Sequence, residues 1–299
     1  MEGRDLDHRN EYIAGTVAML RRYPVKSMLG ETCRALVATA RGLAGDRAWA
    51  VLDGTTGKVA SAKRPKLWGG LLACAARTLD EESQSSSAGV PVEITLPDGT
   101  KHRAGDPDLD RRLSTLIGRA VQLASVPPDE AELDRSHPEA LLAEGLDEDV
   151  ASDILKLGAG APPGTFFDYA PLHLVTTATL NGLSAALSDG AVEPARYRAN
   201  IVIRSPASTP DFPENRWVGG TVRIGDTTVL RIILQTPRCA IPMLAHGRLP
   251  PRPGVVRAAA ERNRIEIPGF GNQPCAGAYA EVLREGTVRE GDPVVFSPA

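Results

Sequence analysis

The sequence of 299 residues has few aromatic residues, 4%, and only four cysteines. No two cysteines lie closer than 36 positions, which excludes a CxxC motif, a zinc knuckle and an iron–sulfur run. The longest uncharged stretch, residues 169–188, contains a proline, a histidine, an asparagine and several hydroxyl side chains, so no membrane partner is expected. The first 12 residues carry charge and lack the apolar stretch of a secretory signal, which predicts a cytoplasmic protein.

Several common functional motifs are also missing. The sequence contains no GxGxxG after a strand, no GxxxxGK[ST], no GxSxG and no HExxH, and its five histidines show no metal-ligand spacing. These absences argue against nucleotide-phosphate binding, common hydrolases and zinc enzymes. Lys and Arg total 34 against 37 Asp and Glu, so no basic excess favours a nucleic-acid partner.

What the sequence does contain is typical of a β-rich α/β protein. Hydrophobic residues make up 42%, and 29 glycines with 24 prolines predict many short strands and turns. Residues 11–125 show such strands with one helix at about 107–118, which predicts a small β-barrel domain. Residues 166–299 predict a second β-barrel domain with a few packed helices.

Residues 126–165 have a different composition. They carry ten acidic and two basic residues, a net charge of −8, whereas the whole chain has −3. Helical patterns at PEALLAEGL and DEDVASDILKL predict an acidic helical linker between the two domains. The remainder of the chain then carries +5, a balance that suits an anionic ligand.

In the second domain, local patterns place two candidate elements. Thr177 is expected to cap a helix with leucines on its inner face. The segment RYRANIVIRS predicts a strand with Ile201 and Ile203 on one face and Asn200 and Val202 on the other. His173, in an apolar strand, is expected to be a core histidine.

Cys239 is the cysteine with the strongest chemical context. It follows the strand VLRIIL in the segment QTPRCAIP, where Pro237 and Pro242 end regular pairing and place the thiol at a rigid corner. The cation of Arg238 next to it favours the thiolate, which is the form that acts as a nucleophile or soft-metal ligand.

Other polar groups stand at strand ends elsewhere in the chain. Lys26 and Ser27 follow a strand in YPVKS, Arg47 opens one in GDRAW, and Arg198 alternates with Asn200 in RYRAN. If these loops converge with QTPRC, they form a phosphate-anchoring pocket around one soft ligand.

The segments YPVKS, GDRAW, RYRANIVI, ENRW, IGDTTVL, PRCAIP and GAYAEVL follow one another in an order that resembles MOSC-domain proteins preceded by a MOSC N-terminal β-barrel. The resemblance runs from about residue 11 to 297. The family includes the mitochondrial amidoxime reducing component and its bacterial relatives. It implies a molybdenum cofactor (molybdopterin), whose metal is bound by a pterin dithiolene and one protein cysteine, and reduction of N-hydroxylated compounds. Pyridoxal phosphate binding is a further association of the family.

The resemblance also implies roles for individual residues. Cys239 is similar to the molybdenum ligand and catalytic cysteine. Thr176 and Thr177 lie at a strand-to-helix turn that the family uses beside the cofactor, and Trp217 is expected in the core. The other residues implied to hold the pterin and its phosphate are Lys26, Ser27, Arg47, Arg198, Asn200 and Arg238.

Two departures from the family pattern affect the expected function. Met28 stands near a position where a cysteine is common, and AIPMLAHGRLPPRP replaces an acidic, Thr-containing stretch, so a different mouth is expected for the small-molecule substrate. No cluster of four cysteines follows the second domain, so electrons are expected from a separate reductase or ferredoxin-like protein.

Two alternatives to a molybdenum reductase remain open. In one, a metal-free MOSC protein uses Cys239 as a nucleophile or persulfide carrier for sulfur transfer or C–S bond cleavage. In the other, the protein carries the molybdenum cofactor and delivers it elsewhere.

Overall fold

The computed structural model describes residues 11–79 and 90–299. The N-terminal segment from which the cytoplasmic location is predicted lies almost entirely outside these residues. Within the two described ranges, no helix is long and apolar enough to cross a membrane.

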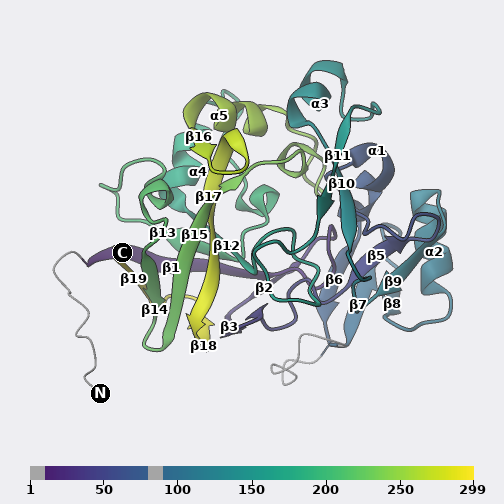
Figure 1. Cartoon of the computed structure of the whole chain (residues 1–299), viewed down its shortest axis with the longest axis horizontal. Coiled ribbons are helices and arrows are strands. Elements are labelled where there is room, and N and C mark those ends of the chain that lie inside the picture. Colours follow the sequence, from purple (N-terminus) through teal and green to yellow (C-terminus); the bar gives the residue numbers. More distant parts are fainter. Residues whose placement is uncertain (1–10, 80–89) are drawn as a thin grey trace.

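A nine-stranded sheet dominates the fold (Figure 1). Its members are β1 (Tyr12–Arg22), β2 (Glu31–Cys33), β12 (Leu172–Thr176), β13 (Ile201–Arg204), β14 (Thr221–Ile224), β15 (Thr228–Pro237), β16 (Arg264–Ile267), β17 (Gly271–Arg284) and β19 (Pro293–Ser297). The strand order is β12–β13–β1–β19–β14–β15–β17–β16, with β2 paired to β1. Because β12 also pairs with β17, seven of these strands close into a barrel.

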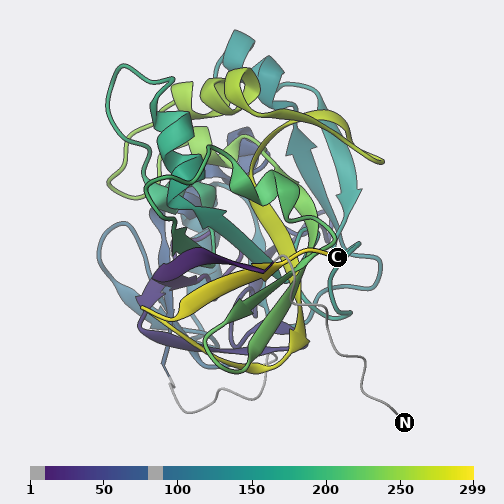
Figure 2. The ribbon, with the colours of Figure 1, turned by 90° about the vertical axis from the view of Figure 1, so that its left-hand side faces the viewer.

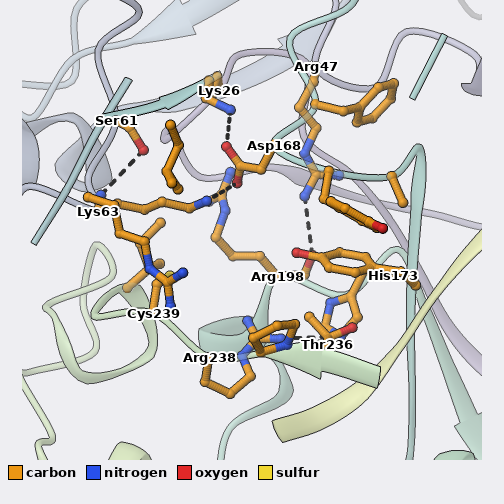
Figure 3. A pocket seen from close by; sticks show the side chains of 18 of the residues that line it. Lys26, Arg47, Ser61, Lys63, Asp168, His173, Arg198, Thr236, Arg238 and Cys239 are labelled. Atoms are coloured by element: carbon orange, nitrogen blue, oxygen red, sulfur yellow. Dashed lines mark hydrogen bonds and ion pairs between the residues drawn. The ribbon is translucent and has the colours of Figure 1, made fainter. Parts of the chain in front are cut away.

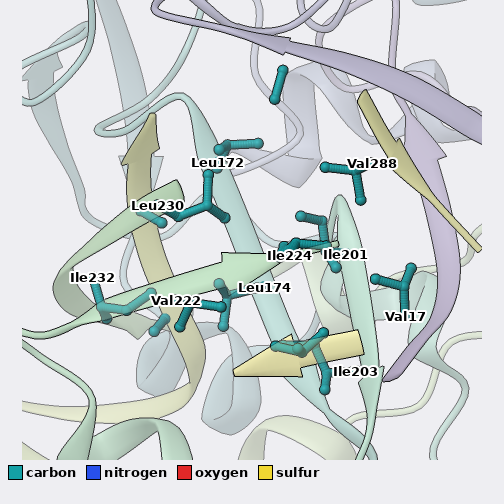
Figure 4. Close-up of a cluster of buried hydrophobic side chains, with 14 of the residues drawn as sticks. Val17, Leu172, Leu174, Ile201, Ile203, Val222, Ile224, Leu230, Ile232 and Val288 are labelled. Atoms are coloured by element: carbon teal, nitrogen blue, oxygen red, sulfur yellow. The ribbon is translucent and has the colours of Figure 1, made fainter. Parts of the chain in front are cut away.

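Alternation of side chains along the strands builds the barrel core (Figure 4). Ile201 and Ile203 point into this core, whereas Val202 packs against a second cluster outside the barrel, as the sequence pattern predicts. Trp217 is buried and stacks on Phe296 with ring centroids 5.7 Å apart, which confirms that it belongs to the core.

Helices cover one side of the barrel (Figure 2). The regular ones are α4 (Thr177–Ser184) and α5 (Gly254–Arg262), and the short 3₁₀ turns are η3 (Pro194–Tyr197), η4 (Pro213–Arg216) and η5 (Ile241–Met243). Apolar residues of α4 and α5 pack with Val175 and Val202 in the second cluster. The helix cap is Thr176 rather than Thr177, because the Thr176 hydroxyl accepts a hydrogen bond from the Thr179 amide.

The N-terminal half consists of smaller sheets. Its strands are β3 (Ala35–Thr39), β4 (Gly42–Leu43), β5 (Ala50–Asp53), β6 (Ala75–Thr78), β7 (Val92–Thr95), β8 (Lys101–Arg103) and β9 (Val121–Ala124), and its helices are α1 (Pro65–Trp68), η2 (Gly69–Ala73) and α2 (Leu109–Ile117). The predicted helix at 107–118 is confirmed as α2. The predicted strand GGLLACAART is wrong in its first half, because η2 continues the helical turn of α1 and packs Leu71 into the core below.

The acidic segment is not entirely helical. It contains β10 (Glu132–Ser136), α3 (Pro138–Glu144) and β11 (Ser152–Lys156), and β10 pairs with β11 along its whole length. The first predicted helix is confirmed as α3. The second is wrong, because strand pairing with β10 takes up the backbone groups of residues 152–156.

The two halves of the chain share their hydrogen bonding. β1 pairs with β13 and β19, and β3 pairs with β18 (Gly286–Arg289). Figure 2 shows β1, in purple, beside the yellow C-terminal strand. The β-rich fold with packed helices is therefore confirmed, whereas the division at residues 125 and 165 stays a proposal about domain organisation.

Candidate functional site

A cavity of about 330 Å³ lies where loops from both halves of the chain meet (Figure 3). Its lining comes from segments far apart in the sequence, between residues 26 and 279. Seven lysines and arginines line it, against a single carboxylate, Asp168, among the described residues. The cavity is therefore suited to an anionic ligand.

Seven of the nine site residues that the sequence predicts line the cavity. These are Lys26, Ser27, Arg47, Arg198, Asn200, Arg238 and Cys239. Six of them are buried, and Arg47 is half-buried. Their convergence in space is what a shared binding site requires, while their roles toward a cofactor stay a prediction.

The predicted set is corrected at Thr176 and Thr177, because neither residue lines the cavity. The Thr176 amide donates to Oε1 of the buried Glu214, and its hydroxyl caps α4. The Thr177 hydroxyl accepts a hydrogen bond from the Ser205 amide at 3.0 Å. The Thr176 groups therefore start the helix and the Thr177 hydroxyl binds Ser205, so neither side chain is directed into the cavity.

One wall of the cavity is a buried ion-pair group. Asp168 contacts the ammonium of Lys26 and lies 3.0 Å from Nζ of Lys63. Lys26 also donates to the Phe166 carbonyl at 2.8 Å. Burial and the charge of Lys63 lower the pKa of Lys26 to about 8, although Asp168 opposes the shift. Burial by itself raises the pKa of Asp168, but the two ammonium groups outweigh it and hold that pKa well below its usual range.

A second group holds Arg47 and Asn200. Arg47 pairs with the buried Asp46 and donates to Oδ1 of Asn200 at 3.2 Å. Asn200 in turn donates from Nδ2 to Asp46 at 2.9 Å. Asp46 therefore fixes two of the groups that line the cavity.

Arg198 lies beside this second group. Its Nη1 donates to the Met28 carbonyl at 2.7 Å, and its guanidinium lies 4.3 Å from the centre of the Tyr23 ring. Burial and the charge of Arg47 lower the pKa of Arg198 to about 10, so the side chain remains charged at neutral pH.

Backbone conformation also marks this cavity. Ser27, Arg47 and Arg198 have φ values of 64°, 47° and 53°, in the left-handed region. They are three of the five non-glycine residues with positive φ in the described parts of the chain. Such conformations cost of order 1–3 kcal/mol each and tend to occur at functional sites.

Cys239 lies at the corner between β15 and η5, where Pro237 ends the strand and Ile241–Met243 form a 3₁₀ turn. Its side chain is buried yet borders the cavity. The nearby ammonium of Lys63 interacts favourably with negative charge on the Cys239 sulfur. Lys63 is therefore a cation near Cys239 that the sequence pattern did not indicate.

Arg238 borders the cavity beside His173. Its guanidinium donates to the carbonyls of Tyr197 and Ala276, each at 3.3 Å, and its Nη1 lies 3.4 Å from Nε2 of His173. Burial and the charge of Arg238 hold the pKa of His173 well below its usual range, so the imidazole is neutral at pH 7. His173 is buried as expected, but it also lines the cavity.

Two polar atoms at the same place lack partners. Nε of Arg238 and Oγ1 of Thr236 are buried, and neither has a hydrogen-bond partner within the described structure. Both residues line the cavity. Because an unpaired buried polar group costs about 1–3 kcal/mol, these atoms fit a ligand that brings polar groups to this wall.

Sequence reasoning missed Lys63, Arg135 and Asp168. Lys63 stands in a loop after a strand, Arg135 in the acidic segment and Asp168 four positions before the first residue of β12. None belongs to a recognisable linear spacing, and only the placement of loops from both halves brings them to the cavity. A charged residue beside a buried strand, as at Asp168, is the one local signal available.

No group of three or more His, Cys, Asp or Glu side chains in the described chain is arranged to hold a metal ion. A metal at this cavity would therefore receive few ligands from the protein, with Cys239 as the soft donor. The excess of cations, the single thiol and the unpaired polar atoms fit an anionic cofactor that carries most of the metal's ligands itself.

Comparison with known proteins identifies two families along the chain. The MOSC domain matches residues 162–295, and the MOSC N-terminal beta barrel domain matches residues 14–95. Among solved structures, the YUAD protein from Bacillus subtilis is 11% identical, with 97% of this chain and 99% of that chain covered and a TM-score of 0.46. YiiM from Geobacillus stearothermophilus is 13% identical, with 43% and 54% covered and a TM-score of 0.29.

None of the curated proteins matches the sequence significantly. The two family matches follow one another in the order expected from the sequence. Together they include all seven cavity residues that the sequence named. The chain is therefore a MOSC-domain protein with a MOSC N-terminal β-barrel domain, and belongs to a family associated with binding of the molybdenum cofactor.

Proposed function

We propose that this protein binds the molybdenum cofactor in the cavity and reduces N-hydroxylated or N-oxide compounds by removal of an oxygen atom. The observation that carries the proposal is the position of Cys239 on a cavity with seven cationic side chains and one carboxylate. A soft metal ligand within a strongly cationic enclosure is the combination that an anionic, metal-bearing cofactor needs.

The residues divide by chemistry. Cys239 supplies the thiolate ligand for the metal. Ser27 and Asn200 add a hydroxyl and an amide at fixed positions, since Ser27 Oγ accepts from the Ala62 amide at 3.0 Å and Asn200 is held by Asp46. The cations that would hold the phosphate and the pterin are Lys26, Arg47, Arg198 and Arg238. The unpaired Nε of Arg238 and Oγ1 of Thr236 support the fit of a polar ligand here.

When bound, the cofactor supplies a site that accepts the substrate oxygen and stores two electrons. Reduction of an N-hydroxylated compound breaks the N–O bond, consumes two electrons and two protons, and gives an amine and water. Lys26 Nζ, with a pKa of about 8, holds a proton inside the cavity at neutral pH. The electrons come from a separate donor protein, a reductase or a ferredoxin-like protein.

The experiment is a turnover assay. Protein produced in a host that makes the molybdenum cofactor is mixed with chemically reduced methyl viologen and benzamidoxime, and benzamidine is measured. We expect product from the wild-type chain and none from Cys239→Ser. The matched control is Cys275→Ser, because Cys275 is buried near Arg238 but does not line the cavity.

The outcomes separate the alternatives. Metal-loaded protein without product contradicts the reductase and points to a carrier of the cofactor. Protein without metal contradicts both, and leaves the thiol chemistry of Cys239. Equal loss of product in both serine variants contradicts the assignment of Cys239.

A further inference from the structure

The cationic side chains of the cavity differ in whether an acceptor in the protein binds them. Six of the seven contact an acceptor: Asp168 for Lys26 and Lys63, Asp46 for Arg47, Glu130 for Lys156, the Met28 carbonyl for Arg198 and the Tyr197 carbonyl for Arg238. The seventh is Arg135. Its guanidinium has no hydrogen-bond or ion-pair partner in residues 11–79 and 90–299.

The position of Arg135 on the hairpin explains why no acid reaches it. Arg135 lies on β10, opposite Asp153 of β11 in the strand register. Asp153 instead lies 3.1 Å from Nε2 of His137. The acid next to it on β10, Asp134, points to the opposite face because side chains alternate, as does Glu132, and Asp134 binds Lys58 and Arg64. The hairpin therefore presents to the cavity a guanidinium without a bonded acceptor in the described structure.

The surroundings of Arg135 make it unfavourable for the guanidinium to remain without a partner. Arg135 is half-buried, and its charge acts unfavourably on the ammonium of Lys63 across the cavity lining. A partly desolvated cation next to a second cation is stabilised when an anion binds to it. The guanidinium fork matches a carboxylate in shape and in donor number.

Arg135 also differs in burial from most of the residues assigned to the cofactor. All of those residues except Arg47 are buried, whereas Arg135 is half-buried and lies on the β10–β11 hairpin with exposed Lys156, which also lines the cavity. A group bound to Arg135 therefore lies toward the solvent side, where a substrate enters.

We propose that Arg135 binds a carboxylate of the substrate, so that the natural substrate is a small N-hydroxylated compound carrying a negative charge. This inference rests on the proposed function, and it defines the substrate class of the same site. It assigns to the hairpin β10–β11 a role in substrate selection.

The test is isothermal titration calorimetry of cofactor-loaded protein, without reductant, with 4-carboxybenzamidoxime and with neutral benzamidoxime. We expect the carboxylated compound to bind about tenfold or more tightly than the neutral one, as a lost charge-assisted hydrogen bond implies. Arg135→Gln abolishes the preference and Arg135→Lys keeps part of it. The control Arg111→Gln, an equal charge change on the exposed face of α2, leaves the preference intact.

Equal binding of the two compounds by the wild-type chain, or no binding of the carboxylated one, overturns the inference. A preference for the carboxylated compound that persists in Arg135→Gln also overturns the inference. Because the titration needs no turnover, a carboxylate preference without benzamidine formation contradicts the proposed reaction but supports the anion site. Turnover without a carboxylate preference supports the proposed reaction and contradicts the anion site at Arg135.

Discussion

Lys26 and Asp168 are separated by 142 positions in the chain, yet the ammonium of one contacts the carboxylate of the other on the wall of the cavity. The contact joins the N-terminal half to the MOSC domain. It also places one negative charge among several positive ones, which reduces their mutual repulsion. The cationic cavity can therefore form in the folded chain before an anionic ligand is bound.

The first prediction concerns pH and anion binding. Burial lowers the pKa of Lys26 to about 8, so the ammonium is present below that pH and is lost above it. We expect the affinity of the cofactor-free chain for inorganic sulfate, which stays divalent in this range, to fall as pH rises through about 8. Binding at that pH takes up about half a proton, since Lys26 is half protonated there.

Titration calorimetry in buffers of different ionisation enthalpy measures this proton uptake. Lys26→Met removes the uptake, whereas Lys101→Met, an exposed lysine paired with Glu93 outside the cavity, retains it. Uptake that persists in Lys26→Met assigns the titration to another group.

The second prediction concerns the loop after Cys239. Arg196 is fully buried and donates to the carbonyls of Leu244 at 3.2 Å and Pro250 at 2.9 Å, and it pairs with Glu193. Arg196→Met leaves these acceptors unpaired, which costs about 2–4 kcal/mol of unfolding free energy in urea. We also expect faster reaction of Cys239 with Ellman's reagent, because the loop that fixes the thiol is released.

Arg257→Met on the exposed face of α5 is the control, with a change within about 0.5 kcal/mol. Unchanged stability and thiol reactivity in Arg196→Met would show that Arg196 does not hold the loop.

The third prediction tests the correction at α4. Thr176→Ala removes the hydroxyl that caps the helix and lowers the unfolding free energy by about 1 kcal/mol. Cofactor content per folded chain stays at the wild-type level, because the side chain does not reach the cavity. Loss of cofactor from a folded Thr176→Ala protein would show that Thr176 takes part in cofactor binding.

Local sequence patterns predicted several elements of the fold correctly. Alternating apolar residues predicted the strand with Ile201 and Ile203 in the core, and leucine spacing predicted α2. The acidic segment shows where local reasoning fails. Residues 152–156 pair with residues 132–136, and such a pairing between distant segments leaves no trace in helical periodicity.

The site was predictable in its residue types but not in its geometry. Strand-end cations and the proline-flanked Cys239 named seven residues that the fold brings together. Lys63 and Arg135 have no comparable local signal, because their proximity to Cys239 or to the cavity depends on how separate loops meet. Thr176 and Thr177 do not line the cavity, because Glu214, 38 positions after Thr176, accepts a hydrogen bond from the Thr176 amide and the Thr177 hydroxyl binds the Ser205 amide.

The most direct measurement is the molybdenum and pterin content of purified protein from a host that makes the cofactor, by metal analysis and by pterin fluorescence after oxidative release. Our account expects about one of each per chain for the wild type and for Cys275→Ser, and loss of molybdenum from folded Cys239→Ser. Absence of both from the wild type, or unchanged molybdenum in Cys239→Ser, would contradict it.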